Sequence, residues 1–328
     1  MKFLVTGATG FVGSVIARQL LKRGDSVRVL ARPASDRRNL IGLQVEIIEG
    51  DLRQAAELSA ACQNVDGLFH VAADYRLWTR DPQALYDSNV AGTVNLMNAA
   101  LAANVPRIVY TSSVATLGTL PSGSPADEDT PVGLTDMIGH YKRSKYLAEL
   151  AVMELVATKR LPAIIVNPST PLGPFDIRPT PTGRIVRDAI RRKIPAYVDT
   201  GLNLVHVEDV ARGHLLAFEK GTLGRRYILG GEDMSLKEIL TAIANLCGHS
   251  PPRIKLPRGL IYPIAYLSQG WAWLTNGPEP QATIDGLRMS KKQMFFSSAR
   301  AVRELGYSAR PGRDAIADAV AWFKRPLA

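Results

Sequence analysis

The sequence predicts an α/β protein in which a doubly wound parallel sheet is followed by a smaller mixed α/β lobe. Short apolar runs alternate with helical segments through the first half of the chain, as strands and helices do around a parallel sheet. The first apolar run leads directly into a glycine-rich turn and an amphipathic segment, which together form a βα unit. A length of 328 residues suits about two domains.

The glycine-rich turn has the spacing G-x-x-G-x-x-G, between a predicted strand over 2–6 and a predicted helix over 11–23. In such a turn the first glycine permits the bend, the second lets the backbone approach a pyrophosphate, and the third allows close packing of helix and strand. Free N–H groups at the helix start face the anion. The alternative is a glycine-rich turn without a ligand. We expect a Rossmann-type dinucleotide site with contacts from Gly7, Thr9, Gly10, Phe11, Val12 and Gly13.

The end of the second predicted strand, over 26–32, bears on the choice of nicotinamide cofactor. NAD-dependent enzymes place an acidic residue there to accept a hydrogen bond from the ribose 2′-hydroxyl. This chain has Arg32, and a guanidinium suits a 2′-phosphate. We therefore expect NADP(H) to be favoured over NAD(H), the alternative being a surface arginine at a strand end.

Further strands are predicted over 45–49, 67–71, 107–112 and 163–166, and helices over 81–104 and 138–159. Residues that follow parallel strands lie at the ligand-binding edge of the sheet. Asp51 and Leu52 follow the third strand, and Ala72 and Ala73 follow the fourth, where small side chains let a cofactor pass or simply pack tightly. Asn89, inside the 81–104 helix, is expected to form internal hydrogen bonds.

The proline-rich stretch over 167–181 indicates an extended exit from the first domain. We assign residues 1–167 to a dinucleotide-binding domain, with 206–222 returning to it, and 168–328 mainly to a substrate-binding lobe. Within that lobe, Ser235 and Glu238 have the spacing of a capping box at a helix start.

Three residues are candidates for catalysis. Tyr141 and Lys145 lie four apart and so share one face of the 138–159 helix. A neighbouring ammonium and an oxidised nicotinamide ring favour the phenolate, which makes Tyr141 an acid/base, and Lys145 can also bind the nicotinamide ribose. Ser113, just after the fifth strand, supplies a hydroxyl to polarise a carbonyl or orient an alcohol. By itself Tyr-x-x-x-Lys is uninformative, but after a dinucleotide fold it indicates catalysis.

These segments resemble the extended short-chain dehydrogenases/reductases over nearly the whole chain. The matching segments are 7–13, 50–52, 71–73, 111–113, 141–145, 167–169, 172–174 and 206–211. The resemblance implies that Asp51 and Leu52 contact the adenine and that Pro168 and Ser169 lie near the nicotinamide. Segments 70–78, 139–145 and 195–207 resemble the bacterial hopanoid-associated sugar epimerases, with dihydroflavonol 4-reductases as better-known relatives.

Two departures from the nucleotide-sugar epimerases bear on function. Those enzymes carry Arg-Asp shortly before a His-Val pair, where this chain has Leu202 and Asn203, so the diphosphate anchor is missing. They also tend to carry an arginine before the Asn-Pro pair, where this chain has Ile164 and Ile165. The sequence therefore leaves open a hopanoid-associated sugar epimerase/oxidoreductase, an NADPH-dependent carbonyl reductase similar to dihydroflavonol 4-reductase, and a non-enzymatic dinucleotide sensor.

The amino-acid composition limits the classes of molecule that the protein is expected to bind. The net charge of +10 is scattered without interleaved stacking aromatics, which argues against nucleic acid. Two distant cysteines and five histidines lack metal-binding spacing, so we expect no metal and a cytoplasmic location. We expect a small-molecule substrate, a sugar or lipid-linked polyol.

The uncharged segment 259–278 has apolar residues at helical spacing, and interrupting polar residues and a proline argue against a membrane span. The pattern favours a helix packed over the substrate lobe or against a second subunit in a homodimer. It leaves open peripheral contact with the inner membrane. The residues that set the helical spacing are Leu260, Ile264, Leu267, Trp271 and Leu274.

Overall fold

The computed structural model describes residues 1–121, 123–275, 277, 280 and 283–325. Its centre is a seven-stranded sheet in which every neighbouring pair is parallel, in the order β10-β6-β5-β4-β1-β2-β3. The predicted fold class is confirmed. The strands are β1 (Lys2–Thr6), β2 (Ser26–Ala31), β3 (Val45–Glu49), β4 (Gly67–His70), β5 (Ile108–Thr111), β6 (Ala163–Pro168) and β10 (Arg226–Leu229).

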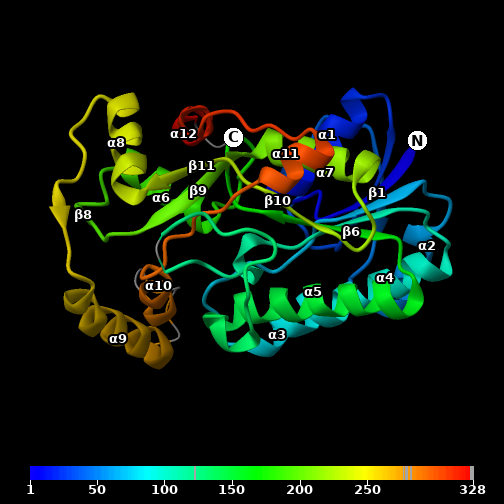
Figure 1. Cartoon of the computed structure of the whole chain (residues 1–328), viewed down its shortest axis with the longest axis horizontal. Helices are drawn as coiled ribbons and strands as arrows, with labels where there is room; N and C mark the ends of the chain where they lie inside the picture. The colour runs from blue at the N-terminus through cyan, green and yellow to red at the C-terminus, as the bar shows by residue number, and fades with distance from the viewer. Residues whose placement is uncertain (122, 276, 278–279, 281–282, 326–328) are drawn as a thin grey trace.

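Helices cover both faces of this sheet (Figure 1). On one face lie α1 (Phe11–Lys22), α7 (Val207–Lys220) and α11 (Ala299–Leu305); on the other lie α2 (Leu58–Cys62), α4 (Gly92–Ala102) and α5 (Gly139–Lys159). Successive strand side chains point to opposite faces, so Phe3 and Val5 join the core beneath α1 while Leu4 joins the core beneath α4. Because both faces of the central strands are buried, β1, β4 and β6 are almost wholly apolar, whereas the edge strand β3 is partly exposed and carries two glutamates.

The helix predicted over 81–104 is interrupted. The chain forms α3 (Pro82–Tyr86), a π-type turn over Asp87–Ala91, and then α4. Asn89 lies in the π-type turn, where its side chain accepts from the Asp74 N–H at 2.7 Å and donates to the Ser144 hydroxyl at 2.9 Å. The prediction that Asn89 forms internal hydrogen bonds is confirmed. Its place in the π-type turn lets its side chain reach both Asp74 and Ser144.

The second lobe contains a three-stranded sheet of β7 (Thr170–Leu172), β9 (Gly201–His206) and β11 (Glu232–Ser235), and a two-stranded sheet of β8 (Ala196–Tyr197) and β12 (Ile254–Lys255). Its core lies against α6 (Pro181–Ile190), α8 (Leu236–Cys247) and α12 (Gly312–Lys324). The capping box is confirmed, since the Ser235 side chain accepts from the Glu238 N–H and the Glu238 carboxylate accepts from the Ser235 N–H. A short helix, α10 (Ile284–Met289), precedes α11 and α12 in the chain.

The chain returns to the first domain over a longer stretch than predicted. α7 packs beside α1, as expected for 206–222. β10, which the sequence assigned to the substrate lobe, pairs with β6 at the edge of the main sheet, and α11 packs on α7 and β10. A strand that follows a helix on one face of a parallel sheet can join the sheet by an ordinary crossover, so the short run 226–229 belongs to the first domain.

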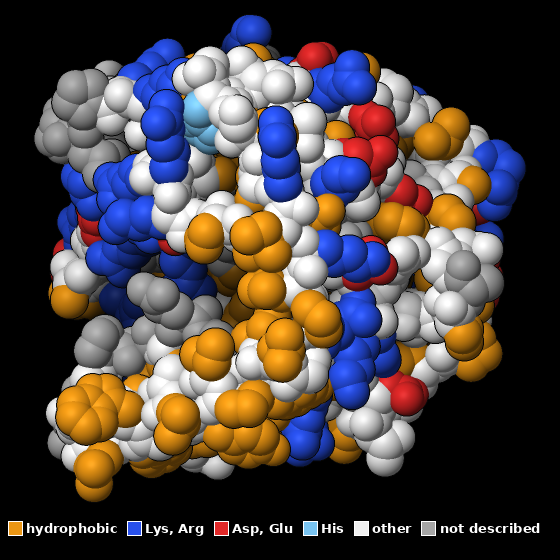
Figure 2. Space-filling view, turned by 90° about the vertical axis from the view of Figure 1, so that its left-hand side faces the viewer, with side chains coloured by type: hydrophobic (Ala, Val, Ile, Leu, Met, Phe, Trp, Pro, Cys, Tyr) orange, Lys and Arg blue, Asp and Glu red, His pale blue; other side chains and the backbone are white. Residues whose placement is uncertain are grey.

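Within the predicted helical segment 259–278, of which residues 276 and 278 lie outside the described residues, the chain forms α9 (Arg258–Thr275). The large apolar side chains of α9 do not pack over the substrate lobe. Trp271 is 69% exposed and Leu274 is 82% exposed, whereas the small Ala265 and Ala272 are the buried positions. Figure 2 shows hydrophobic side chains gathered along the lower part of this face, with Lys and Arg side chains above and beside them. Among the described residues, no helix is long and apolar enough to cross a membrane.

Candidate functional site

The glycine turn joins β1 to α1 at the carboxyl edge of the sheet. Gly7 has φ +73, and a Cβ there would lie 2.7 Å from the Ala72 nitrogen. A Cβ on Gly13 would lie 2.6 Å from the Gly7 carbonyl carbon, so helix and turn are in direct backbone contact. Gly10 is the N-cap of α1 and is exposed, and no side chain caps the helix. The unpaired N–H groups of Phe11, Val12 and their neighbours are therefore available to an anion.

A buried amide that the sequence analysis missed fixes this turn from behind. The Asn39 side chain is fully enclosed, and its Nδ2 lies 3.3 Å from the Thr9 carbonyl oxygen, 3.1 Å from that of Gly10 and 3.0 Å from that of Phe175. Asn39 lies in a single 3-10 turn over Arg38–Leu40 between β2 and β3, which is too short for a periodic pattern to mark it.

A second buried chain of hydrogen bonds supports the neighbouring turn after β4. The Thr6 hydroxyl accepts from the N–H groups of Val71 and Ala72, both at 3.2 Å, and lies 2.7 Å from His70 Nδ1. His70 Nε2 lies 3.0 Å from the Thr93 hydroxyl, which itself donates to the Asn89 carbonyl. This places the hydrogen of His70 on Nε2, and the Thr6 hydroxyl then donates to Nδ1. Ala72 is thereby held against Gly7.

Arg32 is exposed immediately after β2 and has no ion-pair partner among the described residues. Its neighbours differ, since Arg37 pairs with Glu49 and Arg38 pairs with Asp36. An unpaired guanidinium at this edge of the sheet is available to an anionic ligand.

The remaining residues predicted to contact the adenine end of the cofactor lie at the same edge. Asp51 follows β3, and its carboxylate is held by both Nε and Nη2 of Arg53, which lowers the pKa of Asp51. The Leu52 carbonyl accepts from Asn95 Nδ2 at 3.0 Å. Ala73 follows Ala72 in the turn after β4, and both are partly buried.

The structure brings Ser113 and Tyr141 together although they are far apart in sequence. Ser113 follows β5 and Tyr141 lies in the first turn of α5, and the Ser113 hydroxyl lies near enough to the Tyr141 phenol to lower its pKa. The Ser113 hydroxyl oxygen also accepts from the Ala115 N–H at 3.1 Å. Lys145 is buried one turn further along α5, with Nζ 2.9 Å from the Thr111 carbonyl oxygen and 3.2 Å from the Tyr110 hydroxyl.

The electrostatics of this group differ from the sequence prediction in one respect. Burial raises the pKa of Tyr141 to about 12, and the nearby Ser113 hydroxyl opposes that rise. Lys145, which was predicted to lower the pKa of Tyr141, directs its ammonium to the end of β5 instead, and burial lowers its own pKa to about 8. The protein's own groups therefore keep the Tyr141 phenol protonated near neutral pH.

A buried polar cluster, also missed from the sequence, holds the Ser113 segment. Asn167 Nδ2 donates to the Ser113 carbonyl at 3.1 Å and to Glu149 Oε2 at 2.9 Å, and the Thr116 hydroxyl donates to the same carboxylate oxygen at 2.9 Å. Glu149 lies on α5, two turns beyond Tyr141, so this cluster ties the end of β5 to the helix that carries Tyr141 and Lys145.

Pro168 and Ser169, predicted to lie near the nicotinamide, are buried where β6 ends and the chain crosses to the second lobe. The Ser169 hydroxyl donates to the Asn203 carbonyl at 2.9 Å. The Asn203 side chain is itself committed to the fold, since Nδ2 donates to Asp233 at 2.7 Å and to the Phe296 carbonyl at 3.1 Å. His206 caps α7 and lies 3.0 Å from Asp318.

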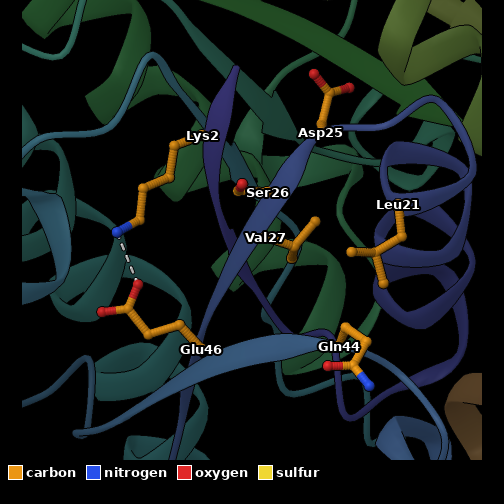
Figure 3. A pocket seen from close by; sticks show the side chains of 7 residues that line it. All are labelled: Lys2, Leu21, Asp25, Ser26, Val27, Gln44 and Glu46. Carbon is orange, nitrogen blue, oxygen red and sulfur yellow. Dashed lines mark ion pairs between the residues drawn. The ribbon is translucent and has the colours of Figure 1, made fainter.

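A surface hollow of about 430 Å³ lies at the opposite edge of the sheet (Figure 3). It is formed at the amino ends of β1, β2 and β3, and Lys2 pairs across it with Glu46 at 2.8 Å. Open α/β sheets bind ligands beyond the carboxyl ends of their strands, so we do not assign the function to this hollow.

The residues at the carboxyl edge fit a nicotinamide dinucleotide. The bare turn at Gly10 leaves backbone N–H groups open to a pyrophosphate, and Arg32 is unpaired. The Ser112 hydroxyl, next to Ser113, is buried without a hydrogen-bond partner among the described residues. Within the same residues, no cluster of three His, Cys, Asp or Glu side chains is arranged to hold a metal ion.

Comparison with known proteins agrees with this geometry. The model of the NAD dependent epimerase/dehydratase family matches residues 3–230. A putative dihydroflavonol 4-reductase of Synechocystis is 44% identical and covers 98% of this chain and 94% of its own length. Sterol demethylase protein B of Methylococcus capsulatus is 37% identical and covers 99% of this chain and 98% of its own length.

Among solved structures, the crystal structure of gox2253 is 53% identical, with a TM-score of 0.88, and the match covers 98% of this chain and 97% of that one. The family match spans the glycine turn, the Ser113 and Tyr141 pair and β10, which is the part of the chain that forms the main sheet. The chain therefore belongs to the NAD dependent epimerase/dehydratase family and is an NAD(P)-dependent oxidoreductase/epimerase of the extended short-chain dehydrogenase/reductase type.

Proposed function

We propose that this protein uses NADP(H) to interconvert a ketone and a secondary alcohol with net reduction or oxidation, on a sugar or polyol attached to a hopanoid-type lipid. The observation that carries the chemistry is the proximity of the Ser113 hydroxyl to the Tyr141 phenol, with Lys145 one turn further along α5. The lipid part of the proposal rests on the resemblance of segments 70–78, 139–145 and 195–207 to hopanoid-associated enzymes.

Each residue of the group has a distinct task. The bound dinucleotide supplies or accepts the hydride at its nicotinamide ring. Tyr141, whose pKa of about 12 keeps the phenol protonated, donates a proton to the oxygen of the ketone as it becomes an alcohol. Ser113 orients that oxygen, and Lys145 binds the nicotinamide ribose in exchange for its contact with Tyr110. In the oxidative direction, the positive charge of an oxidised nicotinamide would favour the phenolate form of Tyr141, which would then accept the proton of the alcohol.

Two observations favour net oxidation or reduction over epimerisation of a nucleotide sugar. The position before His206 that carries a phosphate-anchoring arginine in such epimerases is occupied by Leu202, which packs against the core of the second lobe. Asn203, at the neighbouring aspartate position, has its side chain fully used in the fold. Ile164 and Ile165 are completely buried in β6 and offer nothing to a diphosphate. The names of the two similar curated proteins, a reductase and a sterol demethylase protein, are in keeping with this choice.

Cofactor stoichiometry tests the reaction. The pure protein and NADPH are incubated with an extract of hopanoid-producing cells, and the changed metabolite is identified by mass spectrometry. Consumption of one NADPH per product supports the proposal. An inverted product that accumulates while the cofactor is recycled would instead establish the hopanoid-associated epimerase.

Two phenylalanine variants test the assignment of the acid/base. Tyr141→Phe should lower turnover by about 10²- to 10⁴-fold without weakening NADPH binding. Tyr146→Phe, on the same helix, is the matched control and should keep its activity, because its hydroxyl bonds only to the Val132 carbonyl among the described residues. Full cellular function of Tyr141→Phe would point to a dinucleotide sensor.

We further propose that α9 docks on an anionic bilayer and delivers the lipid part of the substrate. The helix exposes large apolar and aromatic side chains, and its described residues carry no acidic group. Cations surround it: Arg258 begins the helix, Lys291 lies over the Tyr262 ring at 5.6 Å, and Arg80 donates to the Ala272 carbonyl at 2.8 Å. Apolar burial combined with a basic rim is the composition that binds anionic lipid.

The location of α9 suits delivery to the site. Trp78 and Arg80 lie on the segment that follows Ala72 and Ala73 at the end of β4, and Trp78 contacts Trp273 edge to face at 6.4 Å. The docking helix is therefore joined directly to the loop at the cofactor edge of the sheet.

Vesicle sedimentation tests the docking. Vesicles that contain phosphatidylglycerol should bind the protein, and pure phosphatidylcholine vesicles should bind it more weakly. The double variant Trp271→Ser, Leu274→Ser should lose at least tenfold in affinity, because each side chain contributes about 1.5–3 kcal/mol when buried. Leu246→Ser, an exposed leucine of α8, is the control and should bind as the wild type does. A dimer in solution that the double variant dissociates, without vesicle binding, would replace the bilayer with a second copy.

A further inference from the structure

A small polar cavity of about 90 Å³ is lined by residues that follow Ser113 and Tyr141 closely in the chain. Its lining comes from the loop after Ser113, from the lead-in and first turn of α5, and from the segment after α10. The residues that matter here are Ala115, Thr119, Asp136, Lys142 and Lys292. The volume exceeds the ~30 Å³ that one water takes up in the liquid, so the cavity has room for a carboxylate or phosphate group.

Lys142 is buried in this cavity without a proper partner. Its side chain is 9% exposed, and the sole hydrogen-bond partner of Nζ among the described residues is the Met294 thioether sulfur, at 3.9 Å. A thioether is a weak acceptor, and buried ammonium groups are rarely left unpaired in proteins. Burial and, to a smaller extent, the charge of Lys292 together lower the pKa of Lys142 to about 8.

The second lysine adds to the positive charge. Lys292 is partly buried and also faces the cavity, and it has no ion pair among the residues that the structure describes. Asp136 is the acidic residue of the lining, but its carboxylate accepts from the Gly133 N–H at 2.9 Å and is exposed. Two ammonium groups that converge on one polar cavity would be stabilised by a bound anion.

We infer that this cavity is an anion subsite that binds a carboxylate or phosphate group of the substrate between Lys142 and Lys292. The assignment of the anion to the substrate rests on the proposed function. Lys142 is adjacent to Tyr141 in the chain, and Ala115 is two residues from Ser113. The cavity is therefore lined by the direct continuations of the two segments that carry Tyr141 and Ser113, and we place the anionic group of the substrate in the same region of the protein.

Thermal unfolding tests the subsite without a known substrate. Inorganic phosphate and acetate are titrated separately, with sodium chloride at matched ionic strength as the reference. The anion that fits should raise the Tm of the wild type by about 2–4 °C near saturation, and the response to phosphate or to acetate identifies the group. Lys142→Met and Lys292→Met should lose this rise, and Lys142→Arg should retain it. Lys237→Met removes an exposed charge on α8 and should also retain it.

The comparison between variants isolates the cavity, because phosphate that binds at the glycine turn raises the Tm of every variant equally. An equal rise in the wild type and both methionine variants, or no rise beyond that with chloride, would overturn the inference. If Lys142→Met fails to fold, the less buried Lys292→Met carries the test. Tyr141→Phe should keep the full anion-dependent rise in Tm. A failure of the proposed function would therefore appear in the turnover of Tyr141→Phe, whereas a failure of the subsite would appear in the Tm response of the lysine variants.

Discussion

Gly10 is the position at which cofactor binding and folding should separate. A Cβ on Gly7 or Gly13 would collide with backbone atoms, at 2.7 Å from the Ala72 nitrogen and 2.6 Å from the Gly7 carbonyl carbon. A Cβ on Gly10 would meet just one nearby atom, the Gly7 carbonyl oxygen, at 3.2 Å. The backbone of Gly10 is extended, with φ −91, which alanine also adopts. The fold should therefore tolerate a side chain at Gly10. We attribute the glycine at this position to the close approach of a ligand to the turn.

The expected magnitudes follow from this geometry. Gly10→Ala should change the free energy of unfolding by at most about 1 kcal/mol, since the methyl group displaces one neighbour by a few tenths of an ångström. A methyl group inserted between the turn and a pyrophosphate should cost about 1–3 kcal/mol of binding. That range corresponds to a rise of about 5- to 150-fold in the Kd for NADPH.

The assay is a fluorescence titration of NADPH, with thermal and denaturant unfolding of the same preparations. Gly13→Ala serves as the contrasting variant and should lose stability as well as affinity. Gly270→Ala is the neutral control, because a Cβ at that position in α9 meets nothing within 4 Å. Unchanged NADPH affinity in Gly10→Ala would mean that no pyrophosphate lies over this turn. Unfolding comparable to that of Gly13→Ala would mean that the fold itself requires Gly10.

Three further outcomes are expected. Arg32→Asp should weaken NADPH binding much more than NADH binding in parallel titrations, and an unchanged ratio would show that Arg32 does not contact the 2′-phosphate. Burial lowers the pKa of His70 to about 3 and that of His214 to about 4. The unfolded chain therefore binds more protons than the folded chain below pH ~6.5. As the pH falls from ~6.5 to ~4, each histidine should lower the free energy of unfolding by about 1.4 kcal/mol per pH unit. Unfolding of His214→Gln at a series of pH values should give a correspondingly flatter curve. Ser235→Ala should cost about 1 kcal/mol, measured by denaturant unfolding, because it removes the cap that accepts from the Glu238 N–H.

Local patterns in the sequence were sufficient for the fold class, the glycine turn, the helix that carries Tyr141 and Lys145, and the capping box at Ser235. Each depends on residues within a few positions of one another, where chain geometry fixes which side chains share a face or a turn. Asn89 could likewise be assigned an internal role, because an asparagine within a predicted helix more often forms internal hydrogen bonds than binds a ligand.

Tertiary structure alone decided which distant residues meet. It paired Ser113 with Tyr141, directed Lys145 to the end of β5, and placed β10 beside β6. It also left Lys142 without an ionic partner and turned the apolar side of α9 outward. Burial, and with it the pKa of Tyr141 and the charge available for binding, depends on neighbours contributed by separate elements. Periodicity along one helix or strand specifies which side is apolar, but the element that covers that side is set by the packing of the whole chain.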